Sequence, residues 1–333
     1  GICPYCRGAF DDKLALKLWA RNHMEFLKKI IIEKKIPKDI FEIYFPAINQ
    51  LGKEQYILAE EDFSTFSKAI DDLLILLNEI SSTIYDVIPY SRIPLHNYVF
   101  SKIVEYGIDH WYGLFSPRQL LVLAKLTLYI QRRLEELIST NAEFGVAVGL
   151  YLALGVSKAM NFNNLVTSWD PNKRAIRDLI GEYSKGRRIS FPYEYVEAIP
   201  HAVNLPWAFE IEIAKEKKYY RTQGGILPVL RFLCEHLEGL GKLIEVYIAD
   251  ACRLSSFLRD GFFDMIHIDP PYYDQHDYSG ISEFFWVLLK RMLLPAIREG
   301  YLFSQREVKL PGWSPVSDEV PRDVEIPKAD IST

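Results

Sequence analysis

The sequence predicts an α/β protein in which a parallel sheet near the C-terminal end follows a large, mainly α-helical region. Apolar residues recur at helical spacing through much of the first 240 residues. Two apolar runs, 243–249 and 262–268, have the composition of buried strands, with room between them for a crossover. An aspartate follows each run directly, Asp250 and Asp269. Because ligands of open α/β sheets bind at the carboxyl ends of strands, we expect the functional site there.

The composition sets limits on the class of protein. The 333 residues are enough for two or three domains, and 49% hydrophobic with 14% aromatic content favours a globular chain over a disordered one. A net charge of -5 excludes a bulk basic field, so contacts with nucleic acid must come from local patches. No apolar run reaches the roughly 18 to 20 residues of a membrane span, and no secretory signal is visible. We expect a cytoplasmic protein.

Residues 1–10 contain the first motif, Cys3-Pro4-Tyr5-Cys6. Two thiolates two residues apart can hold one side of a tetrahedral zinc ion. A ribbon needs a second pair, and none follows at a usable spacing. We interpret this segment as half of a zinc knuckle in a piece of a longer protein, with the second pair before Gly1, or as a vestigial site. Cys234 and Cys252 are expected to be packed core thiols.

Residues 11–110 form a predicted helical insertion. Apolar side chains from Phe66 to Leu77 recur at helical spacing. The insertion also contains a basic cluster, made of Lys28, Lys29, Lys34, Lys35 and Lys38. Two interpretations are open: a solvated helix face, or a patch that contacts phosphates of a nucleic acid.

Residues 111–222 form a predicted helical and loop region. Ser116 and Pro117 suit the start of a helix, because serine caps the N-terminus and proline tolerates the first turn. A very apolar helix follows from Phe144 to about Met160. A polar stretch comes next, with basic residues Lys173, Arg174, Arg177, Lys185, Arg187 and Arg188. Aromatic residues interleave with them, which makes this stretch a better candidate for a nucleic-acid contact than the lysine cluster at 28–38. A plain surface loop is the interpretation that we favour for it, and the nucleic-acid contact stays open.

Residues 223–305 contain the predicted sheet, and 306–333 form an extended tail. A helix is expected at 224–240, then the two strands, then an amphipathic helix from Ile281 to Leu294 that packs back on the sheet.

The motif Asp269-Pro270-Pro271-Tyr272 has the groups needed to activate an amino group. The lone pair of an exocyclic amino group on adenine is delocalised into the ring, so the amine is a poor nucleophile. Two acceptors on its N–H bonds, the Asp269 carboxylate and the Pro270 carbonyl, favour a pyramidal nitrogen, and the prolines fix the carbonyl direction. Tyr272 can stack on a base that has left the duplex. The plain alternative is a turn, but the preceding apolar run favours catalysis.

The same residues resemble the catalytic motif of the DNA amino-group methyltransferases, which use S-adenosylmethionine. More of the chain resembles one subgroup, the large adenine-specific DNA methylases with an internal zinc ribbon. The matching stretches are 3–6, 114–120, 168–171, 195–200, 249–254 and 269–274.

The resemblance implies a partial Rossmann-like S-adenosylmethionine-dependent methyltransferase sheet with a large mainly α-helical domain or insertion. It implies N6 methylation of a flipped-out adenine in DNA, with Asp269, Pro270, Pro271 and Tyr272 as catalytic residues. Asp250 and Ala251 would contact the methyl donor. Contacts with DNA are expected from Tyr273, Lys173, Arg174, Arg187 and Arg188, and zinc from Cys3 and Cys6.

Two departures keep other functions open. The family has a glycine-rich loop for the methionine end of the donor, and no such loop is found; the later strands of the sheet are also not recognisable after residue 305. A non-catalytic DNA-binding or scaffold subunit is therefore the alternative, as is an enzyme completed by other segments or subunits. N4 methylation of cytosine also stays open. C5 methylation is disfavoured, because it needs a nucleophilic cysteine and neither Cys234 nor Cys252 follows a proline.

Overall fold

The structure is a computed structural model that describes residues 11–37, 49–51, 54–56, 60–170, 175–179, 189, 196–197, 205–209, 225–240, 244–269, 277–304, 307–310, 313–315 and 317. These residues are mainly α-helical, with short two-stranded pairs at three places.

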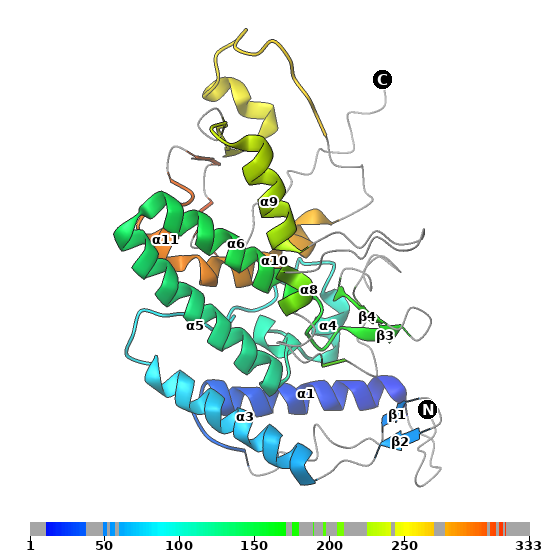
Figure 1. Cartoon of the computed structure of the whole chain (residues 1–333). Helices are drawn as coiled ribbons and strands as arrows, with labels where there is room; N and C mark the ends of the chain where they lie inside the picture. Colours follow the sequence, from blue (N-terminus) through cyan, green and yellow to red (C-terminus); the bar gives the residue numbers. More distant parts are fainter. Residues whose placement is uncertain are drawn as a thin grey trace, which may run out of the picture.

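The centre of the fold is an antiparallel pair of long helices, α5 (Pro117–Thr140) and α6 (Ala142–Asn161) (Figure 1). The predicted start of α5 is confirmed, because Ser116 and Gln119 form a reciprocal capping box and Pro117 occupies the first turn. Gly145 and Gly149 of α6 are buried against α5. A β-carbon on Gly145 would lie 2.7 Å from the backbone nitrogen of Ile138, so glycine is what permits this close approach.

Helix α6 also has the length and composition of a membrane-crossing segment. It is the one helix of this kind among the described residues, and 44% of its most apolar window is buried within the protein.

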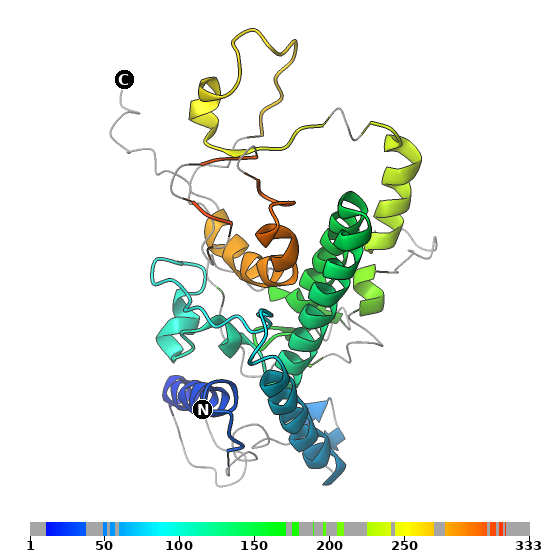
Figure 2. The ribbon, with the colours of Figure 1, turned by 90° about the vertical axis from the view of Figure 1, so that its left-hand side faces the viewer.

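The N-terminal helices pack beside this pair. Helix α1 (Asp12–Ile31) contacts α3 (Glu60–Glu79), α4 (Ser101–Tyr106) and the 3-10 helix η1 (Trp111–Leu114), and α3 lies along α5 (Figures 1 and 2). The predicted apolar face from Phe66 to Leu77 is confirmed, since Phe66, Ile70, Leu73 and Leu77 are fully buried. A cluster of aromatic rings, Phe100, Trp111, Phe115 and Phe284, joins these helices to the C-terminal part of the chain.

The predicted helix beginning near Ile281 is present as α10 (Tyr278–Met292), followed by α11 (Leu294–Arg298). Within the described part of the chain it does not pack on a sheet as expected. Its buried side chains, among them Phe284, Val287 and Leu288, face the helical core, and α10 contacts α5 and α6. An amphipathic pattern specifies that one face is covered but not what covers it, which explains the error.

The strands are short. β1 (Asn49–Leu51) pairs antiparallel with β2 (Glu54–Tyr56), and β3 (Ser168–Asp170) with β4 (Ala175–Arg177). β5 (Ile248–Ala249) pairs parallel with β6 (Val308–Lys309). β5 is the end of the predicted strand 243–249. Two shorter helices, α8 (Leu205–Phe209) and α9 (Ile226–Leu237), pack near α6; α9 lies within the predicted helix 224–240.

The prediction of a buried strand at 262–268 is wrong for this structure. The segment forms no strand, and Phe262, Met265 and Ile268 are 60%, 84% and 73% exposed. It belongs to the yellow loop that extends away from the helices in Figure 2. A strand is stable only when a neighbour satisfies its backbone groups, and no described residue pairs with this run. The prediction of buried thiols also fails, because Cys234 and Cys252 are both exposed.

Candidate functional site

Asp250 follows β5 and caps the 3-10 helix η4 (Ala251–Ser256). Its Oδ1 accepts a hydrogen bond of 2.9 Å from the backbone nitrogen of Cys252. Its Oδ2 lies 3.4 Å from Nε of the exposed Arg253. Asp250 is therefore a helix cap in this structure. One carboxylate oxygen is oriented by the backbone, and among the described residues the other is contacted by a solvent-exposed side chain, so the carboxylate can still accept a hydrogen bond from a ligand.

Asp269 is exposed and has no interacting partner among the described residues. Pro270, Pro271, Tyr272 and Tyr273 lie outside the described part of the chain. The structure thus leaves the predicted catalytic motif untested as a unit.

The remaining predicted contacts also fall outside the described residues. These are the metal ligands Cys3 and Cys6 and the nucleic-acid contacts Lys173, Arg174, Arg187 and Arg188. Within the ranges that are described, no group of three or more His, Cys, Asp or Glu side chains is placed to hold a metal ion.

The fit of the residues to S-adenosylmethionine is partial. Asp250 is an acceptor at the carboxyl end of a parallel strand, which suits the amino group or hydroxyl groups of a nucleoside. Ala251, the first residue of η4, is exposed beside it. The described residues include no glycine-rich loop for the methionine end of the donor.

Sequence reasoning missed a polar cluster at the start of α5. Ser116 Oγ donates a hydrogen bond to Glu197, and Arg118 Nη2 lies 2.6 Å from Glu197 Oε2. Leu165 and Thr167 add two links, one from the nitrogen of Leu165 to the oxygen of Leu114 at 2.8 Å and one from Oγ1 of Thr167 to the oxygen of Val196 at 3.0 Å. The cluster brings together two of the stretches that carry the family resemblance, 114–120 and 195–200. No spacing rule predicts this contact, because it joins a helix cap to a loop.

A second group of buried polar contacts fixes α10, the helix that follows the motif. Arg291 is 3% exposed, and its guanidinium donates to the backbone oxygens of Ile88 and Val287 at 2.8 and 2.7 Å. Gln131 of α5 donates to the backbone oxygen of Arg291 at 2.7 Å. Asn97 donates to the buried carboxylate of Glu283 at 2.6 Å. The bond to Val287 lies within α10, and the other three contacts each cross a long interval of sequence, so α10 is held in one position on the helical core.

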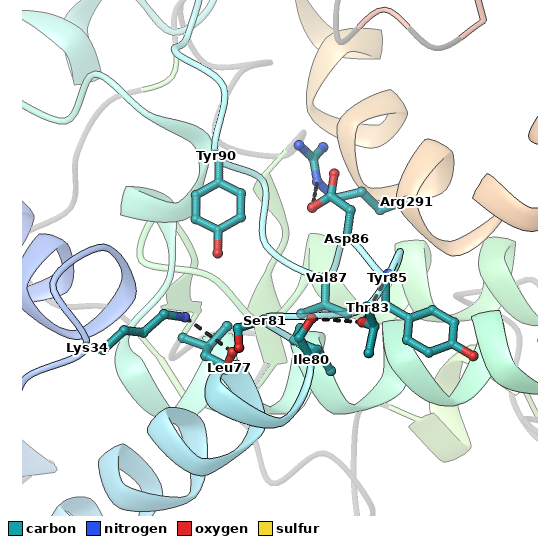
Figure 3. Close-up of a pocket in the computed structure, with 10 residues that line it drawn as sticks. All are labelled: Lys34, Leu77, Ile80, Ser81, Thr83, Tyr85, Asp86, Val87, Tyr90 and Arg291. Atoms are coloured by element: carbon teal, nitrogen blue, oxygen red, sulfur yellow. Dashed lines mark hydrogen bonds and ion pairs between the residues drawn. The ribbon is translucent and has the colours of Figure 1, made fainter.

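A pocket of about 350 Å³ lies where α1 and α3 end and the segment 80–90 begins (Figure 3). Lys34, Asp86, Tyr90 and Arg291 supply its charged and hydroxyl groups, and Leu77, Ile80 and Val87 contribute apolar surface. None of these residues belongs to the predicted methyl-transfer site.

In comparisons with known proteins, no protein-family model matches the chain, and no curated protein or solved structure is significantly similar to it.

Proposed function

We propose that this chain is part of an S-adenosylmethionine-dependent methyltransferase that modifies the N6 amino group of adenine in DNA. The observation that carries the proposal is the motif Asp269-Pro270-Pro271-Tyr272 directly after the apolar run 262–268. A second carboxylate supports it, since Asp250 directly follows β5, whose pairing with β6 is parallel.

The chemistry follows from the types of acceptor in the motif. Asp269 and the carbonyl of Pro270 would accept hydrogen bonds from the two N–H groups of the target amine, which localises the lone pair on nitrogen. Tyr272 would stack on the extruded base and exclude water from one face. S-adenosylmethionine, when bound, supplies an electrophilic methyl group on a sulfonium. Asp250 is the described residue suited to hold the nucleoside end of that donor.

Helix α10, which follows the motif in sequence, supports its position. Arg291 and Glu283 hold α10 on the helical core through buried hydrogen bonds. Helix α10, which begins at Tyr278, is therefore fixed on the core a few residues after the motif, which supports a preorganised site.

The test is transfer of labelled methyl groups from S-adenosylmethionine to duplex DNA by the intact protein, with mass spectrometry of the nucleosides. We expect N6-methyladenine, and we expect Asp269→Ala to lower the rate by at least about 100-fold. Asp264→Ala is the matched control, because Asp264 is an exposed carboxylate on the same segment. Equal rates in the two variants would remove Asp269 from the mechanism, and N4-methylcytosine as product would change the substrate.

A non-catalytic DNA-binding or scaffold subunit is the second candidate. It is favoured by the exposure of the run 262–268, which leaves Asp269 without a rigid support. Calorimetry separates the two candidates, since a scaffold with a degenerate fold has no affinity for S-adenosylmethionine and an enzyme must bind it.

A further inference from the structure

The pocket in Figure 3 contains a lysine in an unusual backbone conformation. Lys34 has φ 55°, in the left-handed region that glycine adopts readily and other residues adopt at a cost of about 1 kcal/mol. The position ends α1, because the backbone nitrogen of Lys35 donates to the oxygen of Lys29 at 3.0 Å. Glycine would serve this helix end better, so the lysine points to a function of its side chain.

The ammonium group of Lys34 is only partly satisfied by the protein. Among the described residues, Nζ donates one long hydrogen bond, 3.4 Å, to the backbone oxygen of Leu77. An ammonium has three donors, so most of its capacity is left for a ligand. Burial lowers the pKa of Lys34, because its charged form is less well solvated in the pocket. An anion bound there would stabilise this charged form.

Tyr90 adds a second donor. In Figure 3 its hydroxyl points into the space bordered by Lys34 and Ser81, and no described residue forms a hydrogen bond with it. Burial, with the negative charge of Asp86 as a smaller cause, raises the pKa of Tyr90, so the hydroxyl is a neutral donor at pH 7. Its ring offers a flat surface for an aromatic ligand.

Asp86 supplies an acceptor on the same wall. Its Oδ1 lies 3.3 Å from Nε of Arg291, and Arg291 is itself held by backbone oxygens. Asp86 is thus fixed in place while it keeps acceptor capacity for N–H or O–H groups. With Lys34 and Arg291 positive and Asp86 negative, the pocket has a net positive charge, and the exposed Lys28, Lys29 and Lys35 extend that charge outside it.

We propose that this pocket binds a nucleoside monophosphate unit, with its phosphate on Lys34 and Tyr90 and its base or sugar near Asp86. The apolar surfaces of Ile80 and Val87 would contact the body of the ligand. A volume of about 350 Å³ lies at the lower end of the range for small-molecule sites, which suits one nucleotide. The nucleotide is either free or part of a nucleic-acid strand, and the site does not depend on the proposed methyl transfer.

The experiment is calorimetry of the full chain with adenosine 5′-monophosphate, and fluorescence anisotropy with a short single-stranded DNA. We expect Lys34→Ala to weaken binding by at least about tenfold and Tyr90→Phe by a few-fold, as for lost hydrogen bonds to a charged group. Lys17→Ala is the matched control, because Lys17 is exposed on the same helix α1 and is absent from the pocket. Adenosine and inorganic phosphate should each bind at least about tenfold more weakly than the monophosphate.

Two ligand arms distinguish the source of the nucleotide. Binding of the monophosphate assigns the pocket to free nucleotides, and binding of the strand alone assigns it to a nucleotide within a strand. The proposal is overturned when neither ligand binds the unmodified chain, or when Lys34→Ala binds as tightly as the unmodified chain. Lys34→Gly is the variant that separates loss of binding from loss of folding. Glycine removes the strain of the left-handed backbone, so this variant should melt at a higher temperature and still fail to bind the ligand.

Discussion

Arg118 and Glu197 form a close ion pair, with 2.6 Å between Nη2 and Oε2, that joins the first turn of α5 to a segment far away in sequence. The arginine also lies over the ring of Phe66 in α3, with its guanidinium carbon 5.4 Å from the ring centre. Ser116, the cap of α5, donates to the same carboxylate. One carboxylate thus links the helix cap, α3 and the segment 196–197.

Glu197→Ala is expected to lower the free energy of unfolding by about 1 to 3 kcal/mol. The change removes an acceptor from two donors and leaves Arg118, whose side chain is 36% exposed, without its counter-charge. Urea unfolding measures this change in the free energy of unfolding. The control is Lys125→Ala, which breaks a 3.5 Å pair between more exposed side chains and should cost less than about 1 kcal/mol. Equal losses in the two variants would contradict a structural role for the cluster.

His23 makes stability depend on pH. The side chain is fully buried, stacks on Trp19, and forms a 2.9 Å hydrogen bond from Nε2 to the oxygen of Gly113. Burial lowers its pKa from 6.5 to about 4. Between these two pH values the unfolded chain therefore binds a proton that the folded chain does not. The contribution of His23 to the free energy of unfolding is complete above pH 6.5 and is lost as the pH falls to about 4. The free energy of unfolding lost over this pH range is roughly 3 kcal/mol.

The measurement for His23 is the free energy of unfolding at pH 7 and at pH 4.5. His23→Gln keeps a donor for Gly113 but does not titrate, so the loss of stability between these two values should be smaller in the variant. The same loss in both proteins would show that other groups set the acid sensitivity.

Gly145→Ala tests the close contact between α5 and α6. Alanine is favoured over glycine in a helix by about 1 kcal/mol, so a propensity effect alone would stabilise the protein. The added β-carbon would lie 2.7 Å from the nitrogen of Ile138 and 2.8 Å from the carbonyl carbon of Leu137, and both are backbone atoms of α5 that cannot rotate away. We expect a net loss of about 1 to 3 kcal/mol in chemical unfolding. An increase in stability would mean that the two helices can separate at no cost.

The elements that local sequence determines were predicted well. Ser116 and Pro117 encode the start of α5, and the spacing of Phe66, Ile70 and Leu73 encodes the buried face of α3. These signals act within one or two helical turns. The partner of Glu197 and the surface that covers α10 could not be predicted in this way, because each depends on contacts between distant segments.

The predicted site shows the same division. Asp250 directly follows β5, as the local pattern predicts, and its bond from Cys252 is also local. A strand at 262–268, by contrast, needs neighbours on its edges, which no local pattern can guarantee, and the described residues provide none.

Ile266→Asp distinguishes an exposed loop from a buried strand at this place. Ile266 is 74% exposed, so the substitution should change the free energy of unfolding of this chain by less than about 0.5 kcal/mol. In a paired strand covered on both faces, an unpaired aspartate at this position would cost several kcal/mol. Glu283→Ala is the control for a buried site, because Glu283 is 1% exposed and accepts from Asn97, and it should be clearly destabilising. A loss in Ile266→Asp that equals the loss in Glu283→Ala would mean that the run is buried in solution, as the sequence predicts for a strand that supports Asp269.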